Sequence, residues 1–164
     1  MRHFTGPGGR YHAALDAGGG AAGSPAGAGN DASPGDAAAA AVVRGFLAAV
    51  DMGDLETLAG LFDPDASGYL PFADTPVLLD GREAVLARFT RLVDAWRARG
   101  KSPPYVGFEP RELLVRPAGP GHALATFLVG IEGDTGRRSL LLRHTPAGWR
   151  ILHLHASNLA PRAG

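Results

Sequence analysis

Four segments typical of β-strands follow one another in the second half of the chain, and this run restricts the possible folds more than any other feature. The segments cover 105–117, 122–132, 137–144 and 149–157, and the connectors PAGPG, GDTG and TPAG lie between them. Connectors this short and this rich in glycine join neighbouring strands that run antiparallel. We therefore predict an antiparallel meander in this half of the fold.

Three helices are predicted before these strands, because apolar residues recur there at three- and four-residue spacing. They are expected to extend over 36–53, 54–63 and 82–100, with a short edge strand at 67–72. In the third helix, four arginines are expected to face water: Arg82, Arg88, Arg91 and Arg99. Helices followed by consecutive strands indicate an α+β domain, with three N-terminal helices packed on one face of a strongly curved antiparallel sheet.

The first 35 residues differ from the rest of the chain in composition. Glycine, alanine, proline and serine dominate this segment, and only Phe4, Tyr11 and Leu15 could anchor a core. Such a segment does not bury enough apolar surface to offset the entropy lost on ordering. We expect a disordered tail at 1–35, one domain at 36–160 and a short C-terminal tail at 161–164.

The charge balance and the absence of cysteine exclude several classes of protein. Lysine and arginine together number 16, aspartate and glutamate also number 16, and there is no cysteine. An even balance without charged blocks argues against a nucleic-acid surface or a polybasic membrane anchor. Without thiols there are no disulfides and no thiolate metal sites. No segment has the pattern of a secretory signal or a membrane span, so a cytoplasmic protein is expected.

The last strand carries two histidines and a serine at alternate positions, so their side chains share one face of the sheet. A three-residue loop that pairs Thr145 with Trp149 would gather an apolar face that contacts the helices: Arg138, Leu140, Leu142, Leu152, Leu154 and Ala156. The opposite face would then form an interface with a second copy of the chain, through Leu141, Ile151, His153, His155 and Ser157.

Two chemical roles for this histidine pair are considered, and neither is favoured. A zinc site needs a third ligand, and no acidic residue is predicted beside His153 and His155. A serine nucleophile needs a base, an orienting acid and an oxyanion pocket, which a flat sheet face does not supply. We expect structural histidines that bond to Ser139 or Ser157, and we predict no metal and no cofactor.

Three segments resemble one protein family in their order and spacing. AVVRGFLAAVDMGDLETLAGLFDPDA, DGREAVLARF and GWRILHLHAS are similar to the SnoaL-like branch of the nuclear transport factor 2-like superfamily, over roughly Asp36 to Leu159. The resemblance implies a cystatin-like α+β cone with a cavity between helices and sheet, and a homodimer or larger ring formed through the outer sheet face. The closing His-x-His-x-Ser also resembles the association domain of calcium/calmodulin-dependent protein kinases. The pocket arginines of that domain align with Leu140 and Ala156 here, and both are absent.

The resemblance implies a small-molecule ligand in the cavity. By face counting, the lining is expected to include Phe127, Val129, Leu140, Leu154 and Ala156. Tyr105 and Arg138 are the further polar candidates, although Arg138 could instead face solvent, and Trp96 either stacks on the ligand or fills the core. Asp74 is the candidate general base, because an apolar surrounding would raise the pKa of its carboxyl group. Tyr69 is the candidate donor to a developing enolate oxygen. The structural alternatives are an Asx-type turn for Asp74 and an edge-strand core position for Tyr69.

Two functions from different classes remain open. The protein is either a cofactor-independent isomerase, cyclase or dehydratase that acts on a small, largely apolar metabolite, or a non-catalytic domain that binds a ligand or oligomerises. A buried pocket carboxylate with a raised pKa would favour catalysis. A cavity filled by its own side chains would favour a non-catalytic domain.

Overall fold

The structure is a computed structural model of the 164-residue chain, and it describes residues 34–131 and 134–159. The tails predicted at 1–35 and 161–164 lie outside the described residues, apart from positions 34 and 35. These two positions already belong to the first helix, which begins earlier than predicted.

The three predicted helices are present. α1 extends over Pro34–Met52, α2 over Leu55–Leu61 and α3 over Arg82–Ala98. Gly53 ends α1 with a φ of 66°, a conformation that residues with a side chain rarely adopt. Asp54 then caps α2, because its carboxylate accepts a hydrogen bond from the Thr57 amide at 2.9 Å.

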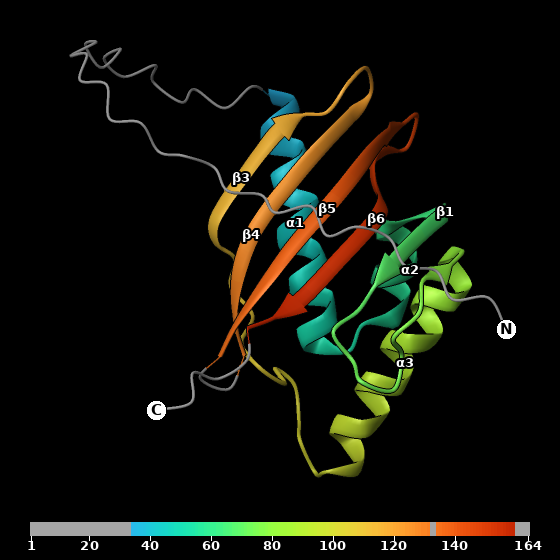
Figure 1. The fold of residues 1–164 in the computed structure, drawn as a ribbon, viewed down its shortest axis with the longest axis vertical. Coiled ribbons are helices and arrows are strands. Elements are labelled where there is room, and N and C mark those ends of the chain that lie inside the picture. The colour runs from blue at the N-terminus through green and yellow to red at the C-terminus, as the bar shows by residue number, and fades with distance from the viewer. Residues whose placement is uncertain (1–33, 132–133, 160–164) are drawn as a thin grey trace, which may run out of the picture. The chain divides into compact units, whose positions relative to one another are not determined.

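Within the described residues, six strands form one sheet in the order β2-β1-β6-β5-β4-β3 (Figure 1). They are β1 Phe62–Tyr69, β2 Leu79–Asp80, β3 Arg111–Pro117, β4 His122–Ile131, β5 Asp134–Thr145 and β6 Gly148–Asn158. β3 to β6 form the predicted antiparallel meander, and the predicted α+β class is confirmed. β1 departs from the prediction, because it pairs with β6 in parallel and makes the sheet mixed.

Two strands depart most from their predicted bounds, while β5 and β6 are only longer at both ends than expected. The strand expected at 67–72 instead begins directly after α2 and is not at the sheet edge, since β2 lies outside it. Its register with β6 is irregular between Phe62 and Ser67, and this stretch accommodates Pro64, which has no amide hydrogen to donate. The strand expected at 105–117 begins only at Arg111.

The hairpin between β5 and β6 differs from the predicted register near its turn. Its loop has two residues rather than three, because Thr145 pairs with Gly148. A register shift follows in β6, where Ile151 pairs with Leu142 and His153 pairs with Leu141. The extra residue of this bulge compensates for the shorter loop, so every predicted pair beyond the bulge is present.

Ile151 is the residue that this bulge moves to the other face. It was predicted on the outer face of the sheet, but it pairs with Leu142 and both side chains are 0% exposed. The prediction for Ile151 was therefore wrong, because the bulge lets two residues of β6 oppose one of β5.

The helices cover one face of the sheet, and α1 runs across the side of β3 to β6 that is turned away from the viewer in Figure 1. Leu140, Leu142 and Leu154 lie on the covered face and are at most 1% exposed. The rings of Phe46, Phe62 and Phe89 join α1, β1 and α3, with centroids 5.8 to 6.0 Å apart. This apolar layer fixes which face of the sheet points to the helices.

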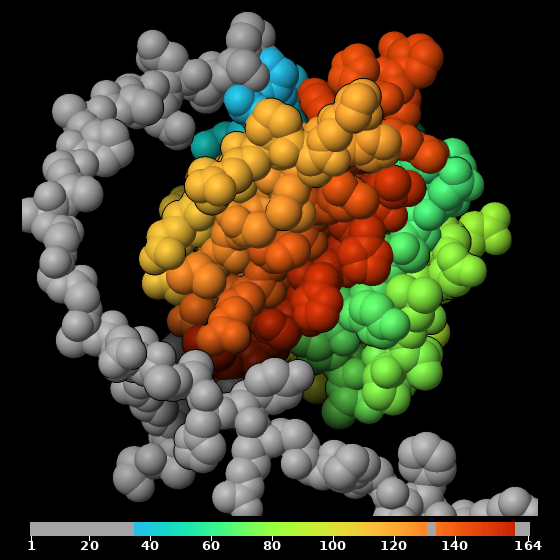
Figure 2. Space-filling model, turned by 45° about the horizontal axis from the view of Figure 1, so that its top comes forward, coloured from blue at the N-terminus to red at the C-terminus, as the bar shows by residue number. Residues whose placement is uncertain are grey.

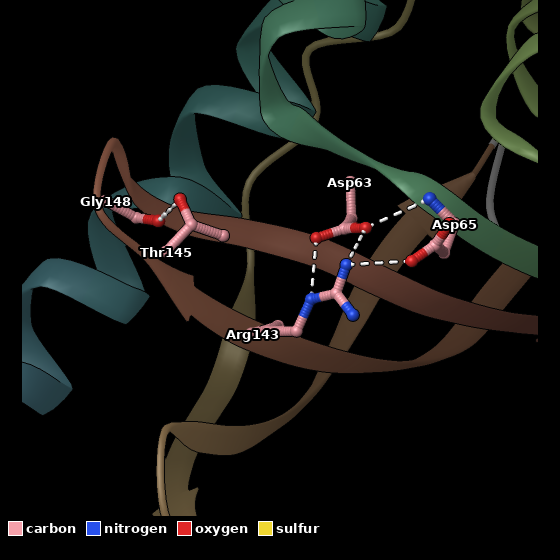
Figure 3. Close-up of polar contacts among 5 residues, drawn as sticks. All are labelled: Asp63, Asp65, Arg143, Thr145 and Gly148. Carbon is pink, nitrogen blue, oxygen red and sulfur yellow. Dashed lines mark hydrogen bonds and ion pairs between the residues drawn. The ribbon is translucent and has the colours of Figure 1, made fainter.

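An ion pair that the sequence pattern does not predict joins β1 to β5 (Figure 3). The Arg143 guanidinium donates to both carboxylate oxygens of Asp63, with Nε 2.9 Å from Oδ2, and to Asp65 at 3.1 Å. Asp63 is fully buried and also accepts from the Asp65 amide at 3.0 Å. The contact therefore holds the irregular part of β1 against the sheet and satisfies a buried charge.

Candidate functional site

A cavity of about 190 Å³ lies between the helices and the covered face of the sheet. The helices and the segment after β1 contribute apolar walls, with Phe46, Val50, Phe72, Phe89 and Trp96 among them. Among the described lining residues, and apart from the Trp96 indole, polar side chains come only from Arg99, Arg138 and Asn158. An apolar cavity with a few polar groups is typical of a small-molecule site.

Five of the predicted pocket residues line this cavity: Trp96, Val129, Arg138, Leu154 and Ala156. Phe127, Leu140 and Tyr105 were also predicted to line it, but they are buried in the surrounding core without lining the cavity. Asn158 lines the cavity although face counting along β6 did not select it. The other lining residues were not selected from the sequence, and they come from α1, from α3 and its end, and from the segments after β1 and before β3. The strand and helix patterns do not specify the course of those two segments.

Arg138 is the principal polar group of the cavity. Nη1 donates to the carbonyl oxygens of Arg137 and Ser157, each at 2.8 Å, and Nη2 donates to Asn158 Oδ1 at 3.2 Å. Burial lowers the pKa of Arg138 to about 10. The side chain is therefore held in place and still carries its positive charge at neutral pH.

Asp51 fixes the segment that leads from α3 to β3, and it was not identified from the sequence. Its buried carboxylate accepts hydrogen bonds from the Val106 amide at 2.6 Å and the Gly107 amide at 2.9 Å. Val106 lines the cavity, and Tyr105 stacks on Trp96 with ring centroids 4.9 Å apart. Asp51 therefore supports one wall of the cavity from α1.

Asp74 lies away from the cavity lining, in an ion pair with Arg88 at 3.0 Å. Desolvation acts to raise the pKa of Asp74, but the charge of Arg88 and hydrogen bonds from Arg88 and Thr75 outweigh it and lower the pKa. The expected raised pKa is therefore wrong. The expectation for Arg88 is also wrong, because its side chain is 7% exposed and lies 3.7 Å over the Phe72 ring.

Tyr69 lies on the open face of the sheet rather than in the cavity. It is 44% exposed, and its ring lies 6.3 Å from the ring of His153 and 6.1 Å from that of His155. The Ser67 hydroxyl is 2.9 Å from His153 Nδ1, in place of the expected bond to Ser139 or Ser157. Asp74 and Tyr69 therefore do not meet around one ligand.

The open face of the sheet is shown in Figure 2, where β3, β4, β5, β6 and β1 lie side by side with no helix over them. Leu114 and Leu124 are 38% and 40% exposed there, and Leu141 is half-buried between them and the histidines. His153, His155 and Ser157 lie on this face, as predicted for alternate residues of β6. No group of three side chains able to hold a metal ion is found among the described residues.

The fold should become less stable as the pH decreases, because His153 titrates. Burial, and then the charge of His155, lower the pKa of His153 from its ordinary value of 6.5. The unfolded chain therefore takes up the proton first, so this contribution to stability is complete above pH 6.5 and is lost as the pH falls through the folded-state pKa. Urea denaturation at about pH 7.5 and about pH 5 should show a smaller loss for His153→Gln than for the wild type.

The matched control for this measurement is His122→Gln, which removes a histidine outside the cluster of Ser67, Tyr69, His153 and His155. This variant should keep the wild-type pH dependence. An unchanged pH dependence in His153→Gln would show that another group is responsible.

The model of the SnoaL-like domain family matches residues 39–161. The chain belongs to the SnoaL-like domain family. No curated protein sequence matches it. Membership agrees with the three helices packed on one mixed sheet, and it is compatible with both a ligand-binding and an isomerase-type domain.

Solved structures share the fold of this SnoaL-like domain, and some of them are described as NTF2-like or cystatin-like. An uncharacterised cystatin-like protein from Caulobacter vibrioides is 20% identical with a TM-score of 0.63, and the match covers 80% of this chain and 94% of that one. An NTF2-like protein of unknown function from Pseudomonas putida is 19% identical with a TM-score of 0.64, covering 77% and 88%. A CamKII hub homology domain from Chlamydomonas reinhardtii is 21% identical with a TM-score of 0.61, covering 76% and 98%. At these identities the likeness shows the fold alone. Among the described residues, no helix is long and apolar enough to cross a membrane.

Proposed function

We propose that this SnoaL-like domain binds a small, largely apolar ligand in the cavity and does not act on it by proton transfer. The observation that carries the proposal is the composition of the lining. Among the described residues that line the cavity there is no carboxylate, imidazole or phenol. General acid–base catalysis needs such a group within hydrogen-bond reach of the reacting atom.

The two residues considered for catalysis support the same choice. Asp74 is neutralised by Arg88 outside the lining, and its lowered pKa makes it a weaker base rather than a stronger one. Tyr69 is on the opposite face of the sheet, beside His153. Proton-transfer catalysis of the isomerase, cyclase or dehydratase type needs an acid or base at the ligand, and neither residue lines the cavity.

The size of the cavity limits the ligand. An engineered apolar cavity of about 150 Å³ in another protein is large enough for benzene. The cavity here is about 190 Å³, so it suits a single ring with a short substituent. A ligand of several fused rings would require the walls to move.

We propose that the open face of the sheet is the contact between two copies of the chain. This face is half apolar, with Leu124 and Leu141 among polar residues such as His155 and Ser157. Apolar surface of this kind is often covered by another subunit. The histidines of β6 would then be interface residues with a structural role.

Binding in the cavity should be reduced by filling it. Ala156 lines the cavity on β6, and Ala156→Leu adds three carbon atoms there. We expect this variant to bind toluene at least about tenfold more weakly than the wild type, since the added side chain occupies the space of the ring. Ligand-observed nuclear magnetic resonance with the full chain measures this affinity.

Ser157→Leu is the matched control, because the next residue of β6 points to the open face and lies outside the cavity lining. It should bind toluene like the wild type, and thermal unfolding should show that both variants are folded. Equal toluene binding by Ala156→Leu and the wild type, or no binding of toluene by the wild type, would refute the proposed function.

A further inference from the structure

We infer that the ligand carries a carboxylate, which the guanidinium of Arg138 holds at the polar end of the cavity. This inference rests on the proposed ligand-binding function and adds the chemical class of the ligand. It is carried by the position of Arg138, by its free hydrogen-bond donors and by the absence of a carboxylate partner.

Arg138 has donors left over for a ligand. A guanidinium has five N–H groups. Toward the described residues, Arg138 uses three of them, on Arg137, Ser157 and Asn158, and these three come from Nη1 and Nη2. Nε–H and one N–H of Nη2 remain. No buried side-chain nitrogen of the described residues lacks a partner, so the unpaired Nε lies where a small molecule or water reaches it.

Arg138 also lacks a counter-charge. Arg88 and Arg143, which are also buried or half-buried, each bind an aspartate, Arg88 with Asp74 and Arg143 with Asp63. The half-buried Arg82 and Arg150 do not line the cavity. No described carboxylate lies within ion-pair distance of Arg138, and burial alone lowers its pKa to about 10. A half-buried charge without a partner is costly in a fold, and an anionic ligand would remove that cost.

The sequence around Arg138 makes room for its side chain. A Cβ atom added at Gly136 would lie 2.7 Å from Arg138 Nη1 and 2.8 Å from Nη2. Gly136 is buried and lies on the same face of β5 as Arg138, two residues before it. The absence of a side chain at Gly136 is therefore a condition for the present position of the guanidinium.

A carboxylate fits this arrangement better than a phosphate. Two adjacent N–H groups of an arginine match the two oxygens of a carboxylate in a side-on pair. A phosphate dianion has more oxygens and more charge than one guanidinium satisfies. The second cation of the lining, Arg99, is exposed at the end of α3. The apolar remainder of the cavity suits the ring or chain that carries the carboxylate.

The test compares three ligands of one ring: benzoate, the neutral benzamide and phenyl phosphate. Isothermal titration with the full chain at neutral pH should show benzoate binding at least about tenfold more tightly than benzamide, and more tightly than phenyl phosphate. Arg138→Gln should abolish the preference for benzoate over benzamide. The control Arg137→Gln, an exposed neighbour whose side chain is on the open face, should keep the preference.

A second variant keeps the positive charge of Arg138 but displaces its guanidinium. Gly136→Ala should push the guanidinium aside and reduce benzoate affinity several-fold without changing toluene affinity, because the clash is with the flexible end of Arg138. Toluene binding by the wild type with equal affinities for benzoate and benzamide would overturn the inference and leave the proposed function standing. If phenyl phosphate binds more tightly than benzoate, the inferred carboxylate is wrong and the ligand carries another anionic group. If none of the rings binds, the proposed function itself fails.

Discussion

Replacing Leu140 with glutamate should leave the protein without a stable folded state. Leu140 is 0% exposed in the layer between sheet and helices. An ionised carboxylate placed there loses its hydration and finds no partner, and this costs several kcal/mol or more. A small domain is stable by only about 5 to 15 kcal/mol. Circular dichroism should show no cooperative thermal unfolding in Leu140→Glu.

The neighbouring substitution Leu141→Glu is the matched control, because it places the same charge one residue along β5 on the open face of the sheet. This variant should unfold cooperatively. If the open face joins two copies of the chain, Leu141→Glu should also be a monomer in light scattering where the wild type is larger. If Leu140→Glu is folded and Leu141→Glu is unfolded, the assignment of the covered and open faces of the sheet is inverted.

Replacing Asp51 with alanine should lower the free energy of unfolding by about 3 kcal/mol. The substitution leaves the Val106 and Gly107 amides without their buried acceptor. The segment that they belong to forms part of the cavity wall, so ring binding should weaken as well. Urea denaturation measures the first effect, and titration with toluene measures the second.

Asp94→Ala is the corresponding control, since Asp94 pairs with Arg97 on the exposed side of α3, at 3.4 Å. It should change the free energy of unfolding by no more than about 0.5 kcal/mol. Asp51→Asn keeps one acceptor oxygen and should fall between the wild type and Asp51→Ala. Wild-type stability of Asp51→Ala would show that the 105–107 segment is held by other contacts.

Much of the fold follows from local patterns in the sequence. The alternation of Leu140 and Leu141 gives the two faces of β5 correctly, because side chains of a strand point alternately to its two sides. The face of Ile151 is not predicted correctly by this alternation. The two-residue loop shifts the register of β6 by one residue, and the bulge shifts it back by one residue. Their effects cancel beyond the bulge, so the pairs around Leu154 are predicted although the turn is not.

The candidate site is predictable only where it lies on regular strands and helices. Trp96, Arg138 and Ala156 follow from the periodicity of α3, β5 and β6. Asp51 does not, because its partner amides lie 55 and 56 residues away in an irregular segment. Asp74 was given a catalytic role because the sequence pattern does not show that Arg88 turns toward it. Long-range polar contacts of this kind have no periodic signature.

The stacking of Trp96 on Tyr105 gives the domain an optical reporter of its own. The chain has two tryptophans, and the other, Trp149, packs against His144 next to the β5–β6 turn, outside the cavity lining. A Trp149→Phe chain would therefore emit from a single indole that lines the cavity. Its emission maximum would follow the polarity of the cavity interior, so that an unlabelled ligand could be detected by the colour of the fluorescence.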